Sequence, residues 1–149
     1  MAKLSPKALK LRAHDHEDLV RLSSLMQDAI VAPKDMRFDA KAKRFVLATN
    51  RFRWEASRGV LGLPKRPTRV RSIVRFDYVE SVQSRGLNTS DDIPLNLLAI
   101  TVQSDAPGER IVLSFSGACD IALQCETVDA TLDDVSAPWA ANVAPKHQV

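Results

Sequence analysis

The order of apolar and polar residues predicts one helix near the start of the chain. Apolar side chains recur there at steps of three and four residues, which is typical of a helix with one buried stripe. The stripe consists of Leu19, Leu22, Met26 and Ile30. Asp15 precedes it and is a preferred N-cap residue, because its carboxylate accepts hydrogen bonds from the free N–H groups of the first turn. Pro33 stops the helix from continuing. We therefore expect a helix over about residues 15–29.

Most of the remaining chain alternates apolar and polar side chains with a period of two, which predicts strands. The expected strands cover residues 9–13, 36–39, 44–54, 69–84, 95–104, 110–116 and 119–132. Two of them change parity, near residues 78–80 and near residues 126–127, which predicts a bulge or bend at each place. Residues 95–104 are apolar on both parities, so we expect a central strand that is covered on both faces.

Strands joined by short turns pair antiparallel. We therefore expect an α+β fold, with a strongly bent or barrel-like antiparallel sheet of about seven strands and one N-terminal helix packed against it. The 149 residues fit a single domain, which we place at residues 8–135. Residues 1–7 and 136–149 are expected to be flexible or loosely docked termini.

The composition indicates a protein of the cytoplasm. No run approaches the roughly 18 apolar residues of a membrane-spanning helix. The first residues lack the apolar core of a secretory signal. The two cysteines, Cys119 and Cys125, are expected to be free thiols on a buried strand face.

Charge is distributed unevenly along the chain. Of the 21 Lys and Arg residues, 18 lie in residues 1–76, whereas 11 of the 18 Asp and Glu residues lie in residues 77–149. Such asymmetry is typical of proteins that bind nucleic acid or a membrane surface, and it also arises when the two halves pair their charges on one folded body.

The densest basic stretch runs over residues 51–75 and contains a single acid, Glu55. Arginines two residues apart share a strand face. If the two basic strands are neighbours, five arginines form one patch on a solvent face, flanked by two further cations. The candidate binding residues are Arg51, Arg53, Arg69, Arg71 and Arg75, with Lys65 and Arg66 in the adjoining loop. Phosphate groups of RNA, DNA or a metabolite are natural ligands of such a patch.

Two observations weigh against nucleic acid. Base stacking needs exposed aromatic rings, and the four aromatic residues nearest the patch are predicted to face inward. They are Phe52, Trp54, Phe76 and Tyr78. Acids on the last strands, such as Asp120 and Asp129, are also available to neutralise the arginines.

Catalytic and metal signals are weak. His14 and His16 are candidate metal ligands, but no third ligand has a recognisable spacing, and helix capping explains the acids beside them. A catalytic cysteine needs a histidine or another cation nearby, and the spacing of the histidines provides none. No phosphate-loop or serine-esterase signature occurs, so no cofactor is expected.

Five strings of sequence resemble a family of short proteins from alphaproteobacteria whose function is unknown. They are Leu25–Ala29, Asn50–Glu55, Val79–Leu87, Leu97–Ile100 and, in the tail, Cys125-Glu126 with Pro138–Ala140. The resemblance covers about residues 8–140 and implies a small bacterial cytoplasmic protein. It implies no activity and no catalytic residues.

These observations lead us to expect a non-enzymatic binding or interaction module. The basic sheet face would bind a protein partner or a second copy of the chain. The alternatives are a protein that binds phosphate or nucleic acid through the same arginines, and an enzyme of unrecognised type.

Overall fold

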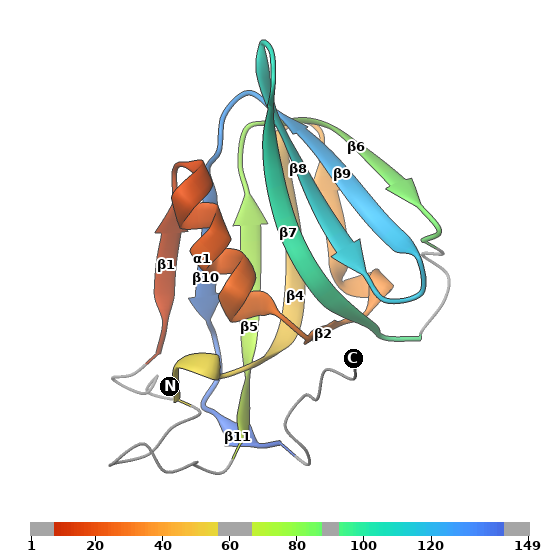
Figure 1. Ribbon diagram of the computed structural model, residues 1–149. Coiled ribbons are helices and arrows are strands. Elements are labelled where there is room, and N and C mark those ends of the chain that lie inside the picture. Colours follow the sequence, from red (N-terminus) through yellow and green to blue (C-terminus); the bar gives the residue numbers. More distant parts are fainter. Residues whose placement is uncertain (1–7, 57–66, 88–92, 142–149) are drawn as a thin grey trace.

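The computed structural model describes residues 8–56, 67–87 and 93–141. In these residues one α-helix, two short 3-10 helices and eleven strands follow each other (Figure 1). Their bounds are β1 (Lys10–Ala13), α1 (His16–Met26), β2 (Ala29–Val31), η1 (Pro33–Asp35), β3 (Met36–Asp39), β4 (Arg44–Phe52), η2 (Trp54–Ala56), β5 (Thr68–Phe76), β6 (Val79–Arg85), β7 (Leu95–Asp105), β8 (Gly108–Phe115), β9 (Cys119–Cys125), β10 (Ala130–Asp134) and β11 (Trp139–Ala140). Of the predicted termini at residues 1–7 and 136–149, residues 1–7 and 142–149 lie outside the described residues, whereas residues 136–141 are described and contain β11, which pairs with β5.

The predicted helix is confirmed, although it ends three residues earlier than expected. Asp15 caps α1, and its carboxylate accepts a hydrogen bond of 2.7 Å from the Asp18 amide. The predicted stripe is buried through Leu19, Leu22 and Met26. The chain leaves the helix at Asp28, whose φ of 63° is left-handed. Ile30, the last residue of the predicted stripe, therefore lies in β2 instead.

The strands form one antiparallel sheet in the order β1-β10-β5-β4-β2-β7-β8-β9-β6, with β3 and β11 pairing with β4 and β5. The expected α+β class with one N-terminal helix is confirmed. The prediction of about seven strands is wrong, because the described residues form eleven, and the sheet that they form is not closed into a barrel.

The bends explain much of this difference. Each of the two strands that change parity is divided at that point, giving β5 with β6 and β9 with β10. Tyr78 lies between β5 and β6 with a φ of 59°, and its carbonyl accepts a hydrogen bond from the Glu126 amide in the facing bend. The Asp77 amide donates in the same way to Asp129. Two neighbouring strands therefore bend together, and the sheet turns through this corner (Figure 1).

The short strand β2 joins the two halves of the sheet. One half contains β1, β10, β5 and β4, and the other contains β7, β8, β9 and β6. Ile30 pairs with Asn50 of β4 on one side and with Asn96 of β7 on the other. Beyond β2 the halves separate, and α1 lies beside the open edge of β7, where the Ser23 hydroxyl accepts a hydrogen bond from the Ile100 amide. The expectation that residues 95–104 are covered on both faces is wrong, because Leu98 is 46% exposed.

The hydrophobic core lies between α1 and the inward face of the bent sheet. Phe45 and Phe76 are paired across β4 and β5, with ring centroids 6.5 Å apart. Leu47, Val74 and Leu132 continue the same face across β4, β5 and β10. The opposite face of these strands is not covered by α1.

Candidate binding surfaces

The two faces of the sheet divide the predicted arginine patch. Arg51 has the same strand parity as Phe45 and Leu47, and its side chain is 0% exposed. Arg69, Arg71 and Arg75 alternate with buried residues of β5 and lie on the outer face. The expectation that five arginines share one solvent face is therefore wrong, and Arg51 is the residue that departs furthest from it.

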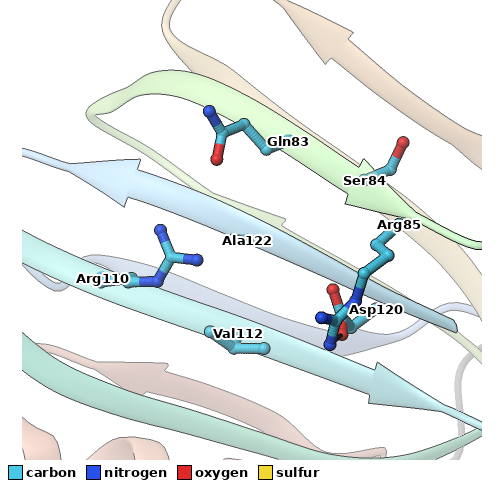
Figure 2. A pocket seen from close by; sticks show the side chains of 7 residues that line it. All are labelled: Gln83, Ser84, Arg85, Arg110, Val112, Asp120 and Ala122. Atoms are coloured by element: carbon cyan, nitrogen blue, oxygen red, sulfur yellow. Dashed lines mark hydrogen bonds and ion pairs between the residues drawn. The ribbon is translucent and has the colours of Figure 1, made fainter. Parts of the chain in front are cut away.

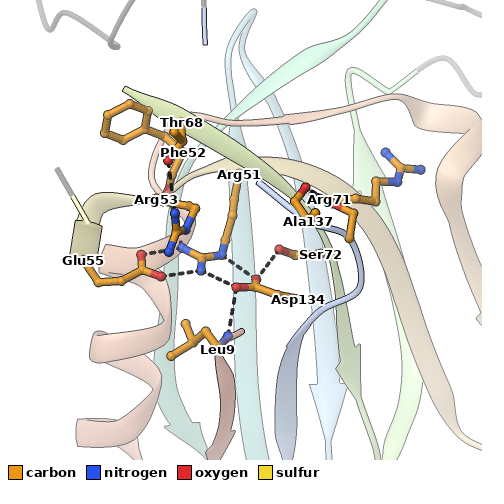
Figure 3. A network of polar contacts seen from close by, with 11 residues as sticks. Leu9, Arg51, Phe52, Arg53, Glu55, Thr68, Arg71, Ser72, Asp134 and Ala137 are labelled. Atoms are coloured by element: carbon orange, nitrogen blue, oxygen red, sulfur yellow. Dashed lines mark hydrogen bonds and ion pairs between the residues drawn. The ribbon is translucent and has the colours of Figure 1, made fainter. Parts of the chain in front are cut away.

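Arg51 is held by two carboxylates at one end of the core (Figure 3). Its Nε and Nη2 donate to Asp134 at 2.9 and 2.8 Å, and its Nη1 and Nη2 donate to Glu55 at 2.8 and 2.6 Å. Asp134 also accepts hydrogen bonds from the Ser72 hydroxyl at 2.7 Å and the Leu9 amide at 3.0 Å. This cluster connects β4, β5, β10 and the residue before β1.

The cluster shifts the pKa of each charged group in it. Burial raises the pKa of Asp134, but the hydrogen bonds from Arg51, Ser72 and Leu9 outweigh burial and leave it below its ordinary value. Glu55 behaves in the same way: burial raises its pKa, and the Arg51 guanidinium lowers it further than burial raises it. Arg51 itself loses affinity for its proton through burial, but the two carboxylates reverse this and raise its pKa. All three groups are therefore charged near neutral pH.

Three other predicted arginines bind acceptors of their own chain. Arg53 donates to the Thr68 hydroxyl at 3.4 Å. Arg69 donates to the backbone carbonyls of Asn50 at 3.0 Å and Asp28 at 3.4 Å, and burial lowers its pKa although the Asp28 charge opposes this. Arg71 donates to the Asn50 side chain at 3.1 Å and to Asp35 at 3.3 Å. Lys65 and Arg66 lie outside the described residues.

A different row of arginines crosses the outer face. The pairing register places five residues of β3, β4, β5, β10 and β1 side by side, with arginines at alternate positions. The row, which we call the arginine row, is Arg37, Val46, Arg75, Thr131 and Arg12. Strands lie about 4.8 Å apart, so neighbouring arginines of the row stand roughly 10 Å apart. Of these three arginines, only Arg75 was a candidate from the sequence.

The arginine row retains positive charge. Asp77 is shared, with one carboxylate oxygen 3.0 Å from Arg75 Nε and the other 2.9 Å from Arg44 Nε. Arg12 approaches Asp129 no closer than 4.0 Å, and its side chain is 58% exposed. Arg37 is exposed and makes no ion pair with any described residue. Strand parity alone predicts that Arg37 faces outward, because it alternates with Met36 and Phe38. The alignment of Arg37 with Arg75 depends on pairing between distant strands, which parity does not predict.

The outer face of the other sheet half carries a shallow pocket of about 690 Å³ (Figure 2). It spans β8, β9 and β6. Val112 and Ala122 pair across β8 and β9 beneath it, and Gln83 continues this line on β6. Arg110 lies at one end, whereas Arg85 and Asp120 form an ion pair of 2.5 Å at the other. Sequence reasoning did not single out Arg85 or Arg110 as site residues.

The candidate metal ligands do not converge. His16 Nε2 lies 2.9 Å from Glu109 Oε2, whereas His14 stands exposed before the helix. Within residues 8–56, 67–87 and 93–141, no group of three or more His, Cys, Asp or Glu side chains is arranged to hold a metal ion.

Cys119 and Cys125 are buried free thiols, as expected. Burial, with a smaller contribution from Glu109, raises the pKa of Cys125 to about 12. A thiol with so high a pKa is a poor nucleophile at neutral pH.

No helix in the described part of the chain has the length and apolar character to cross a membrane.

Comparison with known proteins identifies a family for most of the chain. No curated protein and no solved structure matches the chain. A family model described as protein of unknown function (DUF2948) matches residues 9–147, which agrees with the resemblance to a family of unknown function over about residues 8–140. Because the match spans most of the 149 residues, the chain belongs to the DUF2948 family of proteins of unknown function.

Proposed function

We propose that the chain is a non-enzymatic interaction module of the bacterial cytoplasm that binds an acidic protein surface through the arginine row. One observation carries this proposal: Arg37, Arg75 and Arg12 stand at alternate positions of one row across five strands, on a sheet face that the helix leaves uncovered. Three cations held at regular spacing by a hydrogen-bonded sheet form a preorganised binding surface, so little ordering is needed when the partner binds.

The residues between the arginines favour a protein over a nucleic acid. Val46 separates Arg37 from Arg75, and the adjacent row contributes Ala48 and Ile73, the latter 37% exposed. Aliphatic side chains interleaved with arginine are common in protein interfaces, where arginine is enriched and lysine depleted. Phosphate binding gains nothing from aliphatic groups, and the row contains no aromatic ring on which a base could stack.

The partner is expected to carry Asp or Glu side chains, since complementary charge steers association and suppresses the wrong partners. The individual contacts are exposed, so each contributes modestly, and we expect binding that weakens as salt concentration rises. A second copy of the chain is one such partner, because Glu80 and Glu126 are exposed on another surface, where the two carboxylates share a single cation, Lys43.

The experiment titrates the purified protein with a labelled poly-glutamate peptide and, separately, with a labelled single-stranded DNA oligonucleotide, at graded salt. Sedimentation of the protein alone at the same salt concentrations reports self-association. Arg37→Glu and Arg75→Glu test the row. Arg21→Glu is the matched control, because Arg21 is exposed on α1 and away from the sheet face.

We expect the peptide to bind, and both row variants to weaken it while the control does not. Preferential binding of the oligonucleotide with a steep negative salt slope, lost in the row variants, would replace this proposal by the nucleic-acid alternative. A strict monomer that binds neither probe would refute the arginine row as a binding surface.

A further inference from the structure

We propose that the pocket across β8, β9 and β6 binds a small organic acid, that is, a carboxylate or phosphate group on a short carbon skeleton, with Arg110 as its anchor. This site lies on the other half of the sheet from the arginine row and does not depend on the function proposed above. Its lining residues are Gln83, Ser84, Arg85, Arg110, Val112, Asp120 and Ala122.

The shape of the pocket comes from short side chains on adjacent strands. Val112 and Ala122 face each other across β8 and β9, and Ala122 is paired with Gln83 of β6. The longer side chains stand one position further along each strand face, with Arg110 on one side of this row and Asp120 and Arg85 on the other. Short residues framed by long ones leave the depression of about 690 Å³, within the usual range for small-molecule pockets.

The charges at the two ends of the pocket differ. Asp120 Oδ2 accepts a hydrogen bond from Arg85 Nη2, so this end is close to neutral. Arg110 makes no ion pair with any described residue, and it is only half-buried. A planar guanidinium with no carboxylate partner is well suited to bidentate binding of a carboxylate or phosphate. The free positive charge therefore calls for one anionic group, placed at the Arg110 end.

The floor and the β6 residue beside it determine the rest of the ligand. The methyl groups of Val112 and Ala122 can bury a short apolar segment, but they offer no hydrogen bonds. On the β6 side of the floor, in register with Ala122, the Gln83 amide both donates and accepts, and it can meet a hydroxyl, carbonyl or second acid group. A small organic acid with a second polar group matches what the pocket presents: a cation at the Arg110 end, a short apolar floor beside it, and a polar amide on the β6 side of that floor.

The test uses amide chemical-shift mapping of the full chain, with succinate, glycerol 3-phosphate and inorganic phosphate titrated separately. The pocket is open to solvent, so we expect dissociation constants in the millimolar range. The organic probes should shift the amides of Val112 and Ala122. Arg110→Ala should weaken binding at least about tenfold, because a charge-assisted hydrogen bond accounts for a factor of that order.

Two further variants separate a built pocket from a lone surface arginine. Ala122→Leu fills the floor and should exclude the organic probes while leaving inorganic phosphate at Arg110. Arg21→Ala, on the exposed side of α1 and outside both the pocket and the arginine row, is the control and should change neither. The spectra of the variants also report whether each remains folded.

The proposal is overturned if none of the probes shifts the pocket amides at millimolar concentration, or if Arg110→Ala binds the organic probes as the parent does. It is also overturned if inorganic phosphate alone binds and Ala122→Leu has no effect, since that result describes a surface cation without a ligand pocket.

Discussion

The buried Arg51 cluster makes the sharpest prediction about stability. Asp134→Ala removes the carboxylate that accepts two hydrogen bonds from Arg51 and one each from Ser72 and Leu9. The Arg51 side chain stays 0% exposed in the parent fold, so its charge cannot reach water without local opening. The substitution therefore leaves a buried cation with only one of its two partners.

The size of the effect follows from these contacts. Removing one member of a buried ion pair costs about 3–5 kcal/mol, because the remaining charge has lost its compensation. Glu55 still accepts two hydrogen bonds from Arg51 and is only partly buried, so part of the compensation survives. The lower end of the range applies, and we expect a loss of about 3 kcal/mol. For a chain of this size that corresponds to a fall in melting temperature of roughly 6–12 °C.

The measurement is urea unfolding followed by circular dichroism, with the free energy taken from linear extrapolation. Asp133→Ala is the matched control, since Asp133 is the preceding residue of β10, faces outward and is only half-buried. Its substitution should change stability by no more than about 0.5 kcal/mol. The double variant Arg51→Met with Asp134→Leu replaces the pair by apolar groups and should recover part of the loss.

A loss below about 1 kcal/mol for Asp134→Ala, with an unchanged m-value, would contradict the buried placement of Arg51, because a solvated pair of this kind contributes no more than that. A double variant less stable than Asp134→Ala alone would contradict the account in terms of an uncompensated charge.

Three further predictions follow from groups described above. The pKa values of Asp134 and Glu55 are lower in the folded than in the unfolded chain, so their stabilisation is complete above about pH 5 and is lost as the pH falls through the lowered values. Urea unfolding from pH 7 to pH 3 should show this decline, and Asp134→Asn should reduce it. Cys125, with its pKa raised to about 12, should react with a thiol reagent at pH 8 far more slowly in the folded than in the urea-unfolded chain. Asp15→Ala removes the cap of α1 and should cost about 1 kcal/mol, whereas Asp15→Asn should retain most of it.

Each of these has a contrary outcome. A stability that stays flat down to pH 3 would show that the two carboxylates titrate alike in both states. Equal labelling rates for folded and unfolded protein would place Cys125 at the surface. Equal losses for the two Asp15 variants would exclude the hydrogen bond to the Asp18 amide as the source of the effect.

Local features were predictable from the sequence. The helix and its cap depend on residues within four positions of each other, and both are confirmed at Asp15 and along the buried stripe. The two bends were also visible, because a change of strand parity is a local signal. The bend at Tyr78 is confirmed, but its left-handed backbone turns the ring outward, so Tyr78 is 47% exposed where an inward position was predicted.

Non-local features were not predictable in the same way. β2 and β11 are three and two residues long, too short for any periodicity, and exist only through their partner strands. Whether a sheet closes depends on which strands meet, and no local pattern encodes that. The arginine row has the same origin, since Arg37, Arg75 and Arg12 are aligned by pairing between strands distant in sequence.

The misplacement of Arg51 has a different cause. Parity shows which residues share a face, and Phe45, Leu47 and Arg51 do share one. Because Phe52 and Trp54 favour the other parity, the local pattern is balanced, and the charge of arginine by itself predicts a solvent-facing position. The two carboxylates that make its burial tolerable come from residues 55 and 134, and the second is 83 positions away.

The position of β10 between β1 and β5 has a consequence for synthesis of the protein. Among the described strands, β1 pairs only with β10, and Arg51 receives one of its two carboxylates from the same late segment. In a nascent chain that has emerged only as far as β9, β1 has no partner strand and the edge of β5 that pairs with β10 is free. Arg51 then has Glu55 but not Asp134 as a carboxylate partner. Such an intermediate exposes strand edges to other chains. Folding is therefore completed only when β10 inserts between β1 and β5. We expect a nascent chain halted before residue 130 to aggregate or to require a chaperone.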